Sequence, residues 1–136
     1  MKTMAEYQKE WRSKDPQRNR DMQKKYFSKA KGKATVLFCD AKRRAKKRGL
    51  KLQITKDWIR RKLEAGVCEV TGIPFVLDAS PRSPWSPSLD RINPERGYTY
   101  KNTRLVVWIH NTAKGTWTLD DVERYAEAFL TRARRK

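Results

Sequence analysis

The sequence predicts a small α+β protein, and two patterns carry that prediction. Apolar residues recur at helical spacing in the stretches 33–48, 56–65 and 119–130, whereas short β-rich runs bounded by turn residues lie between residues 50 and 108. A chain of 136 residues with 38% hydrophobic content suits one domain with a modest core. We therefore expect one globular unit with appendages at its ends.

The charge predicts a polyanionic partner. The formal net charge is +18, far more than solubility requires, and nucleic acid is the simplest partner for such a chain. Residues 1–66 hold 22 Lys and Arg against 7 Asp and Glu, a net of +15, whereas residues 67–136 hold 11 against 8, a net of +3. We expect the basic half to supply affinity and the less charged half to supply chemistry.

The cysteines and the hydropathy pattern favour an intracellular protein. Cys39 and Cys68 have no CxxC partners, so their spacing favours two reduced, buried thiols over a zinc knuckle or a disulfide. The N-terminus lacks an apolar signal core, and no stretch is long and apolar enough for a membrane span, so no membrane partner is expected. The sequence does not indicate protein partners.

Residues 1–32 are predicted to form a basic helical arm ahead of a globular domain at 33–136. The helical pattern of residues 4–30 is divided near Asp15 and Pro16, since proline is tolerated in the first turn of a helix but not inside one. Trp11 and Tyr26 stand among lysines in this arm. Either they stack on bases or sugars while lysines meet phosphates, or they dock the arm on the body.

Residues 33–48 are predicted to form an amphipathic helix that Gly49 ends. Its polar face favours a phosphate-binding patch over a merely solvated surface because the whole chain is so basic. The patch consists of Lys42, Arg43, Arg44, Lys46, Lys47 and Arg48.

The remaining elements alternate between short strands and helices. Residues 50–54 alternate like a strand, Thr55 is a capping residue for a helix ending at Gly66, and residues 67–77 resemble two strands around a turn. Thr118 is a second capping residue, for a helix from Leu119. We expect this last helix to bury a stripe of Val122, Tyr125, Ala126 and Phe129.

The stretch 88–115 is the most informative. It predicts a β segment ending at Asn93, a turn-rich connection, a second β segment at 103–108 and a helix that carries Asn111 and Lys114. This order brings a carboxylate from the first strand against a side-chain amide from the helix.

CEVTGIPF, SPSLDRINPERGYTYKNTRLV and HNTAKG together resemble the HNH (ββα-metal, His-Me finger) endonucleases, especially the compact phage-type branch that includes recombination endonucleases. The resemblance covers about residues 34–117, with its core motif at 68–115. It implies Asp90 and Asn111 as ligands of one Mg²⁺ or Mn²⁺ ion rather than zinc, and Asn102 as the asparagine that holds the hairpin loop. It further implies hydrolysis of DNA by a phage- or mobile-element-encoded protein.

Arg91 departs from the pattern, since this position normally holds the histidine that acts as general base. Arginine stays protonated and cannot take that role, but it can hold a phosphate oxygen. Either Arg91 is a positioning residue in an active enzyme, or His110, the single histidine, supplies the imidazole, or the site is inactive. We expect Arg104 and Lys114 to add phosphate contacts.

Three functions therefore stay open: an endonuclease, an inactive DNA-binding or accessory protein, and a small basic RNA-binding protein. A purely structural interpretation also exists, in which Asp90 pairs with Arg91 or Arg104 and the asparagines only cap or turn the backbone.

Overall fold

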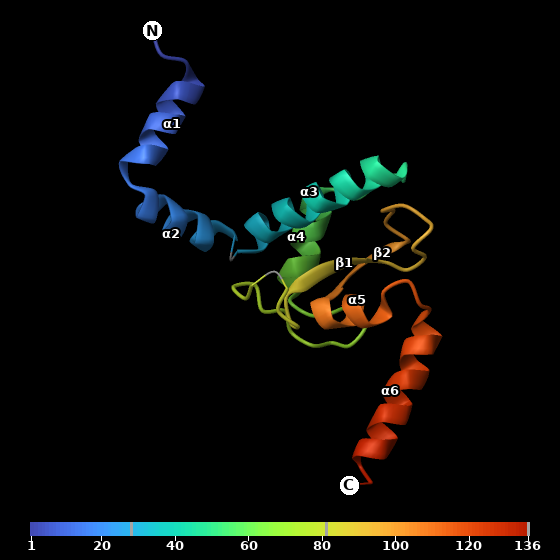
Figure 1. Ribbon diagram of the computed structural model, residues 1–136. Coiled ribbons are helices and arrows are strands. Elements are labelled where there is room, and N and C mark those ends of the chain that lie inside the picture. The colour runs from blue at the N-terminus through green and yellow to red at the C-terminus, as the bar shows by residue number, and fades with distance from the viewer. Residues whose placement is uncertain (28, 81, 136) are drawn as a thin grey trace.

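In the computed structural model, residues 1–27, 29–80 and 82–135 are described, and they form six helices and one two-stranded sheet. The α+β class is confirmed. In Figure 1, α3 and α4 lie above the hairpin and α5 below it, while α1, α2 and α6 extend away from this body. The elements in chain order are α1 (Met4–Lys14), α2 (Pro16–Phe27), α3 (Ala30–Arg48), α4 (Lys56–Ala65), β1 (Pro87–Arg91), β2 (Thr103–Val107), α5 (Trp108–Lys114) and α6 (Leu119–Ala133).

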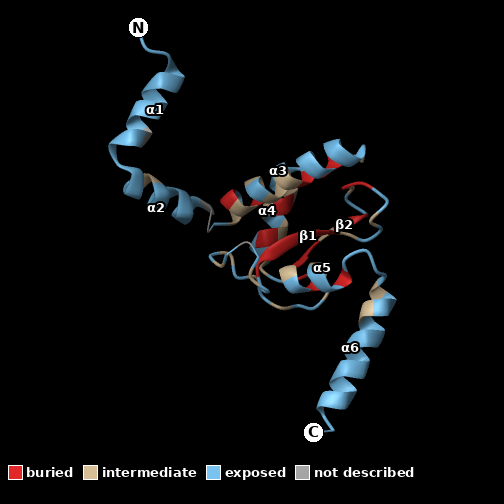
Figure 2. Ribbon diagram, in the orientation of Figure 1, coloured by how far each residue is buried: buried red, intermediate tan, exposed pale blue. Residues whose placement is uncertain are grey.

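The main core lies between α3, α4 and the hairpin. Small residues on α3 allow α4 to pack closely against it, and larger aliphatic side chains from α4 and the strands fill the space between the layers. Figure 2 shows these buried residues concentrated in the body. The cluster contains Ala34, Ala41, Ala45, Ile54, Ile59, Leu63, Leu89, Tyr98 and Leu105.

Local signals fixed the helix ends as expected. The Thr55 hydroxyl accepts a hydrogen bond from the backbone N–H of Trp58, 3.1 Å away, and Gly49 ends α3 with a φ of 64° that favours glycine. Thr118 caps α6 through a capping box with Asp121. The helix predicted from residue 33 begins at Ala30, so the arm boundary predicted after residue 32 falls within the first turn of α3.

Two predicted strand regions are wrong. Residues 50–54 form a single bridge, between Leu52 and Tyr98, and residues 67–77 form one bridge, between Val67 and Pro74. In both places the backbone follows the body's surface, and hydrogen bonds such as that from the Phe75 N–H to the Gly66 carbonyl replace a ladder. The expectation of two buried thiols is half wrong, since Cys68 is buried but Cys39 is exposed.

The expected burial of α6 is also wrong. Val122 is half-buried, whereas Tyr125, Ala126 and Phe129 are exposed, because α6 contacts the body mainly through α5. Figure 2 shows α6 exposed along most of its length. Among the described residues, no helix is long and apolar enough to cross a membrane.

Candidate functional site

The hairpin register places Asp90 at the centre of the site. β1 and β2 are antiparallel, and Asp90 lies directly opposite Arg104. The Asp90 side chain is only 3% exposed, and its Oδ2 accepts a hydrogen bond from Arg104 Nε at 2.8 Å. The structural interpretation of Asp90 as an ion-pair partner of Arg104 therefore holds, and this pair engages the Nε of Arg104.

Lys114 binds the other oxygen of the Asp90 carboxylate. It reaches from the last residue of α5 to Asp90 Oδ1 at 2.8 Å, and its Nζ also donates to the carbonyls of Arg91 at 2.8 Å and Ile92 at 3.3 Å. Its side chain is 2% exposed, so in this structure it cannot contact a phosphate, contrary to expectation. A buried ammonium with three oxygen partners instead ties α5 to the end of β1.

Asn102 holds the loop between the strands. Its Nδ2 donates to the carbonyls of Asn93 at 3.1 Å and Gly97 at 2.9 Å, and its Oδ1 accepts from the Asn93 N–H at 2.9 Å. One buried amide thereby replaces backbone pairing across the loop. This geometry makes Asn102 a positioning residue.

Arg91 lies at the edge of the same loop. Its Nη1 donates to the carbonyls of Pro94 at 2.7 Å and Arg96 at 3.3 Å, and its guanidinium carbon lies 5.3 Å from the centre of the Tyr98 ring. A cation at this distance over an aromatic face is attracted to it. The stacked guanidinium is fixed in place while part of it still borders a pocket.

Asn111 faces that pocket from α5. Its Nδ2 donates to Ser88 Oγ at 2.7 Å and to the Leu89 carbonyl at 2.9 Å. Among the described residues, none donates a hydrogen bond to its Oδ1, which is left as an available oxygen ligand. Ser88 was not predicted as a site residue, although the two-residue period of a strand places it on the same face as Asp90.

The pocket itself has a volume of about 360 Å³ and brings the motif together with α3. Arg44 and Arg48 line it from α3 and Arg91 from β1, so three arginines share one pocket with Asp90 and Asn111. The remaining lining residues are Leu89, Pro94, Tyr98, Gly115 and Thr116.

A second hollow of about 450 Å³ continues along α3. It shares Arg44, Leu89 and Tyr98 with the first pocket and extends to Arg82 and Trp108. The basic patch predicted on residues 42–48 therefore divides in two. Arg43 and Arg44 border these hollows together with Arg48, whereas Lys42, Lys46 and Lys47 are exposed and border neither hollow.

His110 lies outside both hollows. It is 9% exposed, and its buried Nε2 has no hydrogen-bond partner in the part of the chain that the structure describes. Burial lowers the pKa of His110 below its ordinary value; the negative charge of Asp90 opposes this shift, and the cations Arg104 and Lys114 add to it. A neutral imidazole turned into the fold is not placed to activate water in the pocket.

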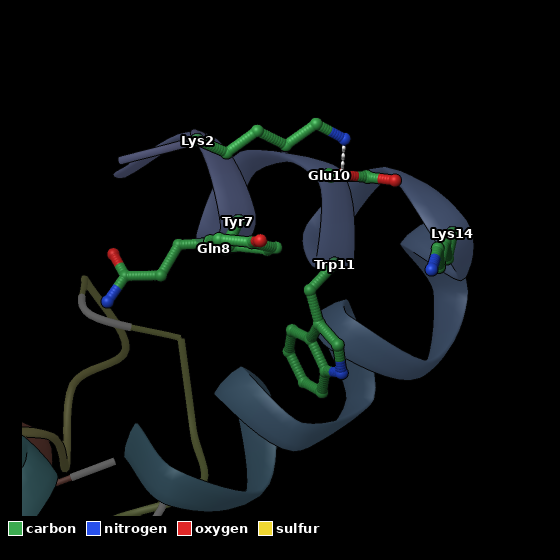
Figure 3. A pocket seen from close by; sticks show the side chains of 6 residues that line it. All are labelled: Lys2, Tyr7, Gln8, Glu10, Trp11 and Lys14. Atoms are coloured by element: carbon green, nitrogen blue, oxygen red, sulfur yellow. Dashed lines mark hydrogen bonds and ion pairs between the residues drawn. The ribbon is translucent and has the colours of Figure 1, made fainter. Parts of the chain in front are cut away.

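The arm carries exposed aromatic and basic side chains. Trp11 is 54% exposed and Tyr26 41% exposed, so neither residue is buried. Figure 3 shows the Trp11 ring extending from α1 on the side away from the ion pair that joins Lys2 to Glu10 at 2.6 Å. A shallow hollow on α1 is lined by Trp11, Tyr7 and Lys14 together with Lys2 and Glu10.

The predicted metal site has few candidate ligands. Among the described residues, no group of three or more His, Cys, Asp or Glu side chains is placed to hold an ion. The oxygens that the two predicted ligands offer are Asn111 Oδ1 and whatever lone pairs Asp90 retains. A carboxylate has about four lone-pair sites, and two are used here by Lys114 and Arg104.

Comparisons with known proteins define the fold. No protein-family model matches the chain, and no curated protein is significantly similar to it. Among solved structures, the rare-cutting HNH restriction endonuclease PacI matches with a TM-score of 0.51 and 21% sequence identity, over 71% of this chain and 76% of that one. The HNH-like fold expected from residues 88–115 is confirmed, and at this identity the likeness concerns the fold alone.

Proposed function

We propose that this protein is a DNA-binding endonuclease that hydrolyses phosphodiester bonds in its ββα pocket with the help of a divalent metal ion. The observation that carries the proposal is the convergence of Asp90 and Asn111 with Arg44, Arg48 and Arg91 around one hollow of phosphate-accepting size. Both the HNH-like fold and the net charge of +18 support DNA as the partner.

The arginines account for phosphate binding. A guanidinium presents donors in a planar fork that matches phosphate oxygens, and it stays charged at all working pH values. Arg44 and Arg48 are exposed and borne on a rigid helix, whereas Arg91 is fixed against Tyr98. The exposed Lys42, Lys46 and Lys47 add affinity that is independent of sequence, since contacts to phosphate carry no base information.

The residues fit a metal ion only as a site that DNA completes. Asn111 Oδ1 and a remaining lone pair of Asp90 are hard oxygen donors, which suit Mg²⁺ or Mn²⁺. Three arginines line the same pocket and oppose a free cation, but a phosphate oxygen brings both negative charge and another ligand. When bound, such an ion supplies stabilisation of the charge on the leaving oxygen. Asn111 orients this arrangement through its bonds to Ser88 and Leu89.

The pocket offers no free general base among the described residues: both oxygens of Asp90, the carboxylate that lines it, already accept hydrogen bonds from Arg104 and Lys114. None of the described residues that line it is a histidine, and Arg91 remains protonated. The attacking water must therefore lose its proton to solvent or to a phosphate oxygen. The cleavage rate should rise with pH through the neutral range without the plateau that a histidine base produces.

A second candidate is a DNA-binding protein with this fold and no catalysis. The specific observation in its favour is that both Asp90 oxygens already accept hydrogen bonds from cations, one from the buried Lys114 and one from the half-buried Arg104. This protein would bind DNA equally well with and without metal. The RNA-binding alternative is tested by competing structured RNA against duplex DNA over a range of salt concentrations.

The test combines nicking of supercoiled plasmid with binding to labelled duplex, branched and single-stranded DNA, each with Mg²⁺, Mn²⁺ or EDTA. The pocket pair Arg44→Gln/Arg48→Gln is compared with the matched control Lys42→Gln/Lys46→Gln, which removes the same charge from the same helix. Both pairs should weaken binding alike. Only the pocket pair, and Asn111→Ala, should lower kcat, by about 100-fold. Metal-independent binding with no cleavage of any substrate would establish the second candidate instead.

A further inference from the structure

α6 presents an apolar face that is largely open to solvent in the described part of the chain. Tyr125 is 72% exposed, Phe129 62% and Leu130 47%, and their neighbourhood extends to Trp117, 67% exposed, just before the helix. The rings of Tyr125 and Phe129 stack with their centres 6.4 Å apart. In Figure 1, α6 extends away from the body, and its contacts with the other described elements are mainly with α5.

The apolar residues of α6 follow a coiled-coil spacing. They recur at alternating intervals of three and four residues, which is the pattern that forms a seam between two paired helices. The residues at the seam positions are Leu119, Val122, Ala126, Phe129 and Ala133. Tyr125 and Leu130 flank the seam on either side. A helix with this pattern is typical of one that pairs with another helix.

The distribution of charge along α6 favours a second copy of the same helix as its partner. Residues 119–127 contain four acidic side chains and one arginine, a net of −3, whereas residues 128–135 contain three arginines and no acid, a net of +3. Two copies side by side in the same direction would repel at both ends. In the antiparallel direction each acidic half lies beside a basic half, so the helix is complementary to itself.

We infer that α6 pairs antiparallel with α6 of a second copy of this chain, and that the protein is a homodimer through this helix. A register that sets residue 122 against residue 133 of the other copy places the large Phe129 against the small Ala126 in both directions. It also brings Arg132 beside the ring of Tyr125, where a cation is attracted to the aromatic face.

DNA does not fit this face. The acidic residues of its N-terminal half are Asp120, Asp121, Glu123 and Glu127, and these would repel phosphates. The strongly basic surfaces lie on α3 and the arm, away from α6. The inference needs no nuclease activity, and its test is carried out without DNA.

The test measures the mass of the full chain by light scattering and analytical ultracentrifugation over concentrations up to about 0.1 mM. The wild type should form dimers. Phe129→Glu should raise the dimer dissociation constant by at least about tenfold, because it places a charge in the seam. Thr131→Glu adds the same charge to the same helix outside the seam and should leave the dimer intact. Circular dichroism checks that both variants keep their helix content.

Orientation is tested by disulfide formation in a Cys39→Ser background. Val122→Cys and Ala133→Cys chains, one of them tagged, are mixed and oxidised. Antiparallel pairing should give mainly the mixed disulfide, whereas parallel pairing would give mainly the two symmetric ones and would overturn the inference. A wild-type chain that stays monomeric over the whole concentration range, or equal loss of dimer in Phe129→Glu and Thr131→Glu, would also overturn it.

Discussion

Replacing Lys114 with methionine should destabilise the fold far more than any other Lys-to-Met change on this basic chain. Methionine keeps most of the aliphatic volume but removes the ammonium. Its loss leaves Asp90 Oδ1 and the carbonyls of Arg91 and Ile92 without the donor that now lies 2.8, 2.8 and 3.3 Å away, respectively. The Asp90 carboxylate lies where water does not reach it easily, since the side chains of Lys114 and Asp90 are 2% and 3% exposed, and the bonds to the two carbonyls are partly buried.

The magnitude follows from these contacts. Removing one partner of a buried ion pair costs about 3–5 kcal/mol because the remaining charge is left unpaired. Here Asp90 keeps its 2.8 Å bond to Arg104, which moderates the loss, so we expect the lower end, about 3 kcal/mol. For a chain of this length, such a change lowers Tm by about 10 °C.

The assay is urea unfolding followed by tryptophan fluorescence and circular dichroism. Lys47→Met is the matched control, because Lys47 is exposed on α3 and the same chemical change there should stay within about 0.5 kcal/mol of the wild type. If the free energies of unfolding of Lys114→Met and Lys47→Met differ by less than about 1 kcal/mol, then Lys114 is not the buried tie between α5 and β1.

Three further outcomes test the fold around the site. Gly97→Ala should lower the free energy of unfolding by about 2 kcal/mol, since the added Cβ would lie 2.3 Å from the carbonyl oxygen of Lys51; an unchanged urea midpoint would contradict this contact. Asn102→Ala should cost about 2 kcal/mol through its lost loop bonds and increase hydrogen exchange at the Asn93 amide, which a merely exposed asparagine would not do. The pKa of His110 is lowered by burial, so the unfolded chain binds the proton more readily than the folded one. Stability should fall as pH drops below about 6.5, and urea midpoints at about pH 7.5 and about pH 5.5 should differ less in His110→Leu than in the wild type.

The hairpin was predictable because its signals are local, whereas the roles of Asn102 and Asn111 were expected only from the family resemblance. A turn-rich connection between two β segments fixes the antiparallel register, and the register alone places Asp90 opposite Arg104. Helix ends followed from capping residues such as Thr55 and Thr118 in the same way. In each case the residues that determine the structure are close together in the sequence.

The remaining features depend on contacts between segments that are far apart in the sequence. The spacing of Tyr125 and Phe129 shows that α6 is amphipathic but does not show which surface, if any, covers it. Lys114 was expected to contact phosphate at the surface. No sequence pattern predicts its burial, because its partner Asp90 lies 24 residues away along the chain. Arg44 and Arg48 were expected to bind phosphate as part of a patch, but only the packing of α3 on the hairpin brings them to the motif.

The ion pair between Asp90 and Arg104 also determines which alignment of the two strands is acceptable. The two strands have only five residues each, so this pair adds to the loop bonds of Asn102 in excluding a shift of one strand past the other. A slip by one residue would turn Asp90 to the opposite face and leave it buried beside no cation from β2. Two apolar residues at these positions would pack with similar stability, yet would allow several alignments to coexist. The ion pair therefore contributes specificity. It favours one alignment of the two strands over the shifted alignments, so the loop and the pocket form in the same place in every molecule.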